Sequence, residues 1–271
     1  MQRSVHEEVD VQVLPGATPF RCSGRPEGHG VGVLLSHGFT GTPQSLRPWA
    51  EHLAERGYAV RLPRLPGHGT TWQGLNRTEW HDWLAVLERE LHALWDECET
   101  VVVGGLSLGG ALVTRLAEEH GPRISGLMLV NPAYRSDDLR LRGLPVMRRL
   151  VPSIAGIASD IHLEGVVELA YDRTPLHALA SMTRLWRLTV RDLPEITQPV
   201  LLCQSDEDHV VPASSSELLL SRISSTDVTH LRLRDSYHVA TLDHDAARIF
   251  EESVAFIERV TTGEGDGDPR P

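Results

Sequence analysis

Short runs of apolar residues alternate with longer amphipathic stretches through most of the chain. Four of these runs have the length of buried strands and are bounded by glycine, proline or polar residues: 31–35, 58–62, 100–103 and 125–130. Between them, apolar side chains recur at helical spacing, most clearly over 80–94. This alternation predicts an α/β fold, with a mostly parallel sheet covered by helices on both faces.

The same pattern returns in the last quarter of the chain. Residues 199–203 and 228–233 predict two further strands, and a final helix is expected to begin near Asp245. Near the N-terminus, residues 9–13 suggest a short edge strand. Residues 42–56 predict one helix, with a threonine cap followed by proline at the first helical position.

The segment 133–198 breaks this rhythm, because it contains no convincing strand. It carries short amphipathic pieces at 144–150, 166–171 and 176–190. An insertion between strands at the catalytic end of such a sheet predicts a helical cap that encloses an apolar pocket.

These patterns predict a division of the chain into three parts. Residues 1–132 and 199–262 would form one α/β core, and residues 133–198 would form the small helical cap. Residues 263–271 have the composition of a disordered tail.

The most informative motif is Gly-Leu-Ser-Leu-Gly at 105–109, between a strand at 101–103 and a helix at 111–117. Strand, tight turn and helix form the nucleophile elbow of serine hydrolases, which exposes the hydroxyl of the central serine, Ser107. The spacing is short enough to arise by chance, and an inert Gly-Ser-Gly turn is the alternative. The flanking strand and helix favour the elbow.

A serine nucleophile of this kind needs an acid and then a histidine, in that chain order. Three carboxylates follow the strand at 199–203, namely Asp206, Glu207 and Asp208. Asp208 is favoured because it directly precedes a loop that opens a helix. The other two would then belong to a solvated acidic loop or lie near a helix N-terminus.

The base is expected on a loop after the last strand, and His238 occupies that position. The chain has 14 histidines, so a histidine in a loop is weak evidence by itself. His230 lies in the predicted strand, His244 at a helix start and His209 beside the acid. His238 would take the proton of Ser107 as the hydroxyl attacks a carbonyl carbon.

The oxyanion of the tetrahedral intermediate requires N–H donors that are already in place. One should be the backbone of Leu108, which follows the nucleophile, and the other should come from the loop after the strand at 31–35. In that loop the backbone of Phe39 is the candidate, with a purely structural aromatic as the alternative. His37 is expected to orient the loop.

Composition narrows the possible partners. The net charge is −11 without a basic stripe, which argues against nucleic acid and against attraction to an anionic membrane. The three cysteines are far apart and suggest neither a disulfide framework nor a metal site, and we expect no cofactor. We find no signal peptide and no apolar run of membrane-spanning length. A cytoplasmic protein without stable membrane insertion is the expectation, while the oligomeric state is left open.

Five motifs together resemble those of the bacterial monoacylglycerol lipases and their close carboxylesterase relatives. They occupy residues 37–43, 65–69, 105–110, 205–212 and 236–243. The resemblance extends from about residue 30 to 260, and the two late motifs are its most specific part. The elbow is shared by most α/β-hydrolases.

The resemblance implies Ser107, Asp208 and His238 as catalytic residues, with Phe39 and Leu108 as oxyanion donors. Residues 166–175 also resemble the cap of that family. There the glutamate corresponding to Glu168 helps to recognise the glycerol hydroxyls, and Ile157 lies where the cap lines the pocket. From the residues alone, Glu168 could equally be a solvated glutamate on a helix.

The resulting hypothesis is a serine hydrolase that cleaves monoacylglycerols to glycerol and fatty acid, or similar short-to-medium-chain carboxylic esters, through an acyl-enzyme on Ser107. Another chemistry on the same fold, such as that of a thioesterase, lactonase or C–C hydrolase, is the alternative. A non-catalytic binding protein of this fold is a third possibility, against which the intact motifs argue. The expected partner is a small lipid ester.

Overall fold

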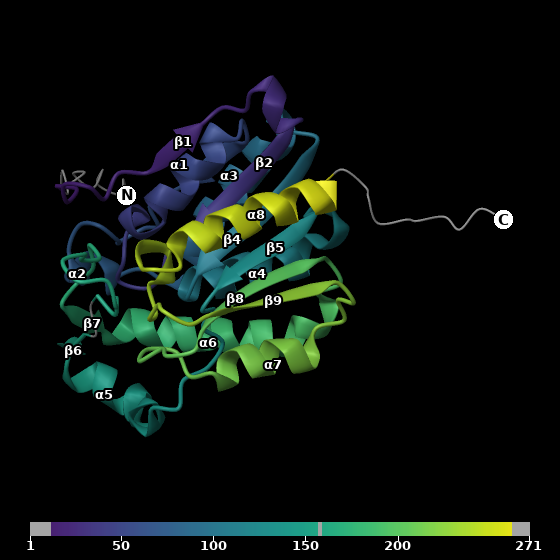
Figure 1. The fold of residues 1–271 in the computed structure, drawn as a ribbon. Coiled ribbons are helices and arrows are strands. Elements are labelled where there is room, and N and C mark those ends of the chain that lie inside the picture. The colour runs from purple at the N-terminus through teal and green to yellow at the C-terminus, as the bar shows by residue number, and fades with distance from the viewer. Residues whose placement is uncertain (1–11, 157–158, 262–271) are drawn as a thin grey trace, which may run out of the picture.

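A seven-stranded sheet runs through the centre of the molecule in the computed structural model, which describes residues 12–156 and 159–261 (Figure 1). The strand order is β1-β3-β2-β4-β5-β8-β9, and β1 is antiparallel to β3 whereas the other neighbours are parallel. The strands are β1 (Phe20–Cys22), β2 (Val31–Ser36), β3 (Ala59–Leu62), β4 (Thr100–Leu106), β5 (Gly126–Val130), β8 (Val200–Ser205) and β9 (Val228–Leu233).

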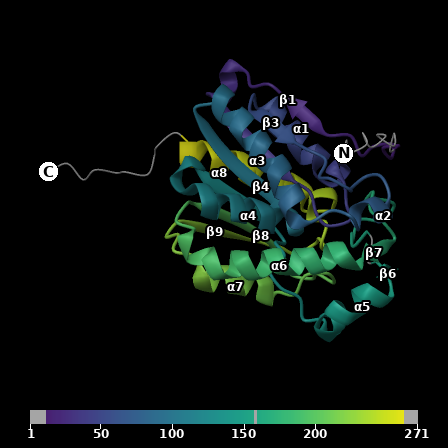
Figure 2. The ribbon, with the colours of Figure 1, turned by 180° about the vertical axis from the view of Figure 1, so that it is seen from behind.

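Helices cover both faces of this sheet. The helix α8 (Ala246–Thr261) crosses one face with α1 (Arg47–Glu55), whereas α3 (Trp80–Glu97), α4 (Leu108–His120) and α6 (Leu176–Asp192) lie on the other (Figures 1 and 2). The remaining helices are α2 (Trp72–Leu75), α5 (Leu144–Leu150) and α7 (Ser214–Arg222).

Successive residues of the central strand β4 point into two separate cores. Val101 and Val103 belong to the core under α3 and α4, whereas Val102 packs with residues of α1 and α8. Because side chains alternate across a strand, a sheet covered on both faces needs apolar residues at every position. This explains the continuous apolar runs in the sequence, and the predicted α/β fold is confirmed.

The single helix predicted over 42–56 is divided. A 3₁₀ turn at Pro43–Leu46 precedes α1, and Thr42 caps this turn by accepting a hydrogen bond from the backbone N–H of Gln44. Pro48 has no N–H with which to continue an α-helical ladder onto the carbonyl of Gln44. The α-helix therefore begins one turn later than predicted.

The edge strand predicted at 9–13 falls mostly outside the described residues, and Gln12 and Val13 are not in a strand. The edge of the sheet is instead β1, in which Phe20 pairs with Leu62 of β3. The strand has only three residues, which is too short for its alternation to be recognised.

The segment between β5 and β8 contains two helices, as predicted, but the prediction of no strand there was wrong. Residues Ser153–Ala155 (β6) and Arg173–Pro175 (β7) form a small antiparallel ladder. Residues 166–171 are not a helix either. Several of their backbone groups bond outside the segment instead: the side chain of Gln44 accepts a hydrogen bond from the N–H of Leu169 and donates one to the carbonyl of Val167, and the N–H of Glu168 donates to the hydroxyl of Ser159.

Candidate active site

Ser107 stands at a sharp turn between β4 and α4. Its backbone has φ 55° and ψ −118°, a conformation that non-glycine residues rarely adopt. A Cβ at Gly105 would lie 2.4 Å from backbone atoms of Gly109, and a Cβ at Gly109 would lie 1.9 Å from the carbonyl oxygen of Ser36. The two glycines of the motif therefore permit the turn, and the predicted strand-turn-helix geometry is present.

His238 and Asp208 meet at the same end of the sheet, on the loops that follow β9 and β8. The Nδ1 of His238 lies 2.8 Å from Oδ2 of Asp208, and both side chains are buried. The other oxygen of Asp208 accepts hydrogen bonds of 2.8 Å from the N–H groups of Val210 and Val211. The carboxylate is thus held by its own loop and oriented towards the imidazole.

The two competing carboxylates face elsewhere. Asp206 accepts a hydrogen bond of 2.6 Å from the exposed guanidinium of Arg232. Glu207 lies 3.2 Å from Nε2 of His209 and is also exposed. The structure therefore brings Asp208, and neither neighbour, to His238.

The imidazole and the carboxylate stabilise each other's charged forms. Burial lowers the pKa of His238, but the nearby carboxylates of Asp208, Glu168 and Asp160 outweigh it, so the pKa lies above its ordinary value. Burial alone would raise the pKa of Asp208, yet the attraction and hydrogen bond from His238 keep it below its ordinary value. An anionic Asp208 can consequently stabilise an imidazolium at position 238.

Three residues that the sequence analysis did not identify fix the backbone of the histidine loop. Asp160 accepts a hydrogen bond of 3.2 Å from the N–H of His238, and Asn131 donates one of 2.8 Å to its carbonyl oxygen. Asp243 accepts a hydrogen bond of 2.9 Å from the N–H of Tyr237. Asp160 and Asn131 are 78 and 107 positions away from His238, so no local signal could have revealed them, whereas Asp243 lies within the motif at 236–243.

A cavity of about 210 Å³ lies above Ser107 and His238. Its walls are mainly apolar side chains from the segment between β5 and β8, including Leu144, Ile154 and Met182. Ile157, which the sequence analysis expected in this wall, lies outside the described residues.

The predicted oxyanion donors lie beside the nucleophile. Leu108 is the first residue of α4, so its N–H has no acceptor within the helix. The loop that contains Phe39 approaches from β2, and a Cβ at Gly38 would be 3.5 Å from the Cβ of Ser107. The ring of Phe39 packs against Trp83, so its aromatic side chain also belongs to the core.

His37 orients this loop, as the sequence analysis expected. Its Nε2 accepts a hydrogen bond of 3.2 Å from the N–H of Leu65, so the proton is on Nδ1, which donates to the carbonyl of Gly38 at 3.0 Å. Burial lowers the pKa of His37 to about 4, so the ring is neutral at neutral pH.

Glu168 lines the cavity together with Ser107 and His238. Its carboxylate is desolvated, which raises its pKa to about 7, although the attraction of His238 acts in the opposite direction. A Cβ at Gly41 would lie 2.6 Å from Oε1 of Glu168. Glycine at position 41 therefore makes room for the carboxyl group of Glu168 in the cavity.

Within the part of the chain that the structure describes, no helix is both long and apolar enough to cross a membrane.

The comparisons with known proteins agree with this geometry. A family model described as serine aminopeptidase, S33 (Hydrolase_4) matches residues 29–245. The chain is 44% identical over 247 residues to a thermostable monoacylglycerol lipase of Bacillus sp. (strain H-257), covering 91% of this chain and 96% of the relative. It is 26% identical over 231 residues to a carboxylesterase of Bacillus subtilis (strain 168), covering 84% of this chain and 92% of that relative.

Solved structures show the same fold. One, reported for the metagenome-derived lipolytic enzymes LipS and LipT, has 42% sequence identity and a TM-score of 0.88, and the match covers 92% of this chain and all of that chain. A monoacylglycerol lipase of Paleococcus ferrophilus has 21% sequence identity and a TM-score of 0.74, and the match covers 90% of this chain and 99% of that chain. The chain therefore belongs to the Hydrolase_4 family of α/β-hydrolases, in its group of bacterial monoacylglycerol lipases and carboxylesterases.

Proposed function

We propose that this protein is a serine hydrolase that cleaves the ester bond of monoacylglycerols, or of similar short-to-medium-chain esters, to release the alcohol and the fatty acid. The observation that carries this proposal is that Ser107 and His238 line one cavity, with Asp208 hydrogen-bonded to His238. The 44% identity to a bacterial monoacylglycerol lipase supports the choice of substrate.

In the proposed reaction, Nε2 of His238 accepts the proton of Ser107 while the serine oxygen attacks the ester carbonyl. Asp208 holds the imidazole in the required tautomer and stabilises the imidazolium. His238 then protonates the leaving alcohol. Water repeats the cycle on the acyl-enzyme, and the fatty acid leaves.

The negative charge that develops on the carbonyl oxygen would be stabilised by the backbone N–H groups of Leu108 and Phe39. Donors that are fixed before the reaction are effective because they need no reorganisation in the transition state. The positive end of α4, which begins directly after Ser107, adds to this stabilisation.

The segment 133–198 acts as the cap in this proposal, with its apolar side chains around one acyl chain. Glu168 would bind the glycerol hydroxyls, since a carboxylate can accept two hydrogen bonds from neighbouring hydroxyl groups. A diacylglycerol lacks one of these hydroxyls and brings a second acyl chain, which would have to share the cavity of about 210 Å³ with the first.

A substrate panel tests this function. Monoacylglycerols, triacylglycerols, p-nitrophenyl esters and acyl-CoA are compared at equal concentrations, and an organophosphonate ester probe identifies the nucleophile by mass spectrometry. We expect fast hydrolysis of monoacylglycerols, poor hydrolysis of triacylglycerols and labelling of Ser107. Preferential cleavage of acyl-CoA or a lactone would favour the thioesterase or lactonase alternative, and labelling of another serine would refute the triad.

A further inference from the structure

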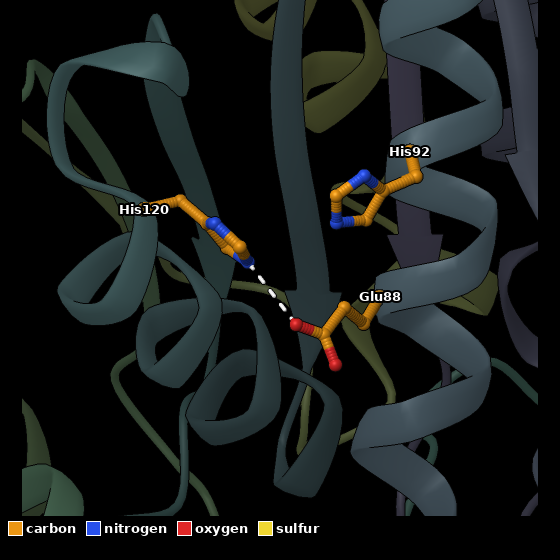
Figure 3. A group of neighbouring side chains, drawn as sticks. All are labelled: Glu88, His92 and His120. Carbon is orange, nitrogen blue, oxygen red and sulfur yellow. Dashed lines mark ion pairs between the residues drawn. The ribbon is translucent and has the colours of Figure 1, made fainter.

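A second group of ionisable side chains lies on the outer surface of α3 and α4. Glu88 and His92 are four residues apart on α3, so they occupy the same face of that helix. His120, the last residue of α4, faces them (Figure 3). One ligand atom from each of the three side chains lies within 4.8 Å of the others.

The spacing of these atoms is close to that of a metal centre. Nε2 of His120 lies 3.6 Å from Oε1 of Glu88, and ligand atoms around a tetrahedral zinc ion are about 3.3 Å apart. His92 is exposed and can rotate about its side-chain bonds to close the remaining gap. Two imidazole nitrogens and one carboxylate oxygen are a typical zinc ligand set, with water as the fourth ligand.

The ring of His120 has a nitrogen that makes no hydrogen bond, although it faces Glu88 at ion-pair distance. Its Nε2 is shielded from solvent and makes no hydrogen bond to any described residue, since its separation from Glu88 exceeds hydrogen-bond length. Buried polar atoms normally make hydrogen bonds, so a shielded imidazole nitrogen that faces a carboxylate and a second imidazole without one indicates a missing ligand.

The indole of Trp95 lies against both imidazole rings. Trp95 contacts His92 and His120 edge to face, with ring centroids 5.0 Å apart in each case. The indole is itself held by Arg123, whose carbonyl accepts its N–H at 3.2 Å and whose guanidinium stacks on it at 3.7 Å. The charge of Arg123 opposes a cation, whereas Glu119 and the negative C-terminal end of α4 favour one.

We propose that Glu88, His92 and His120 bind one zinc ion that joins the C-terminal end of α4 to the middle of α3. The site is structural, because α4 is 13 residues long and separates His120 from Ser107 by about 20 Å. The ion would clamp the end of the helix whose other end carries the nucleophile. The inference is independent of the substrate and of the proposed reaction.

The test is zinc binding by the full-length protein after treatment with EDTA. Isothermal titration with ZnCl₂ should give one equivalent per chain, and a hundredfold excess over the dissociation constant should raise the Tm by about 5 °C. MgCl₂ should leave the Tm unchanged, because magnesium prefers oxygen ligands. The initial rate of ester hydrolysis at 25 °C should be the same before and after removal of zinc.

Variants that each lack one proposed ligand distinguish this site from zinc binding at other histidines. His92→Ala removes an exposed ligand without disturbing the core, and Glu88→Gln keeps the shape of the side chain. Each should weaken zinc binding at least tenfold and reduce the rise in Tm at the same zinc concentration to about half or less. His81→Ala, which removes an exposed histidine of the same helix, should retain both effects. An unchanged response in His92→Ala and Glu88→Gln, or no response in the unaltered protein, would overturn the proposal.

A competing site is tested separately. His209 lies near Asp160 and Glu207 on another surface, so His209→Ala should leave zinc stabilisation intact. Loss of stabilisation in His209→Ala, with retention in His92→Ala, would place the ion there and contradict the assignment to α3 and α4.

Discussion

The sheet and residues 133–198, which we call the covering segment, are packed in different ways. Leu202 in β8 is fully buried, as are most apolar residues of the central strands. On the outer side of the covering segment, by contrast, Leu139, Val146 and Leu150 are 68%, 61% and 77% exposed. The first region is held together by continuous apolar packing, whereas the second leaves large apolar side chains in contact with solvent.

Polar contacts tie the covering segment to the sheet. Asp243 accepts hydrogen bonds from the N–H groups of His162 and Leu163 at 2.7 and 2.9 Å. Asp160 accepts a hydrogen bond from the N–H of His238. Within the covering segment, α6 packs into the same core as α3 and α4. The contrast therefore lies between the packed sheet and its helices, on which the proposed chemistry rests, and the exposed outer side of the segment.

Ser107→Ala should reduce ester hydrolysis by about 10⁶-fold, the scale found when a serine protease loses its nucleophile. The hydroxyl contributes little to packing, so circular dichroism should show an unchanged fold. An active Ser107→Ala protein would mean that the elbow does not supply the nucleophile and that the sheet does not carry the chemistry.

Asp208→Asn should reduce kcat by about 10⁴-fold, because an amide at this position no longer sets the required tautomer of His238. Asp206→Asn is the matched control and should change kcat less than about threefold, since that carboxylate pairs with exposed Arg232. Steady-state kinetics on a p-nitrophenyl ester distinguishes the two, and the opposite ranking would reassign the acid.

Leu202→Ala and Leu150→Ala compare the packing of the two regions directly. The first removes a fully buried side chain and should lower the free energy of unfolding by about 2–5 kcal/mol. The second removes a side chain that is 77% exposed and should change it by less than about 0.5 kcal/mol. Urea denaturation measures both; equal costs would show that the covering segment packs as tightly as the sheet.

Glu168→Ala should lower kcat/KM for a monoacylglycerol by about 5- to 150-fold, the cost of leaving polar groups of the substrate unpaired. The same change should have much less effect on p-nitrophenyl esters, which carry no glycerol. Glu164→Ala, on the exposed part of the same segment, should affect neither substrate. An equal loss for both substrates in Glu168→Ala would make Glu168 a structural residue.

The smallest expected effect is a shift in the pH profile of kcat/KM in Glu168→Gln. A general base must be neutral, so kcat/KM should rise with pH through the pKa of His238, which lies above its ordinary value. Glu168 contributes to this rise in pKa, so Glu168→Gln removes a negative charge and should move the acidic limb to lower pH. A limb that stays in place or moves to higher pH would show that the two groups are not coupled.

Much of the sheet could be predicted from the sequence, because β2, β3, β4, β5, β8 and β9 are long enough to show their apolar runs and the longer helices show their own periodicity. The elbow could also be predicted, since the conformation of Ser107 depends on glycines two residues away on either side. Predictions failed where the elements were short or held from outside. The three-residue strands β6 and β7 are too short to show an apolar pattern. Residues 166–171 form no helix, and two of their backbone groups bond to the side chain of Gln44 instead.

The sequence by itself determined the order of the elements and the position of the candidate nucleophile, because both follow from interactions between residues close together in the chain. Only the tertiary structure decided which of three neighbouring carboxylates meets His238, and that Glu168 is enclosed beside it. It also decided that His120 joins Glu88 and His92. These are contacts between side chains far apart in sequence, and no local periodicity encodes which distant loops and helices the packed sheet brings together.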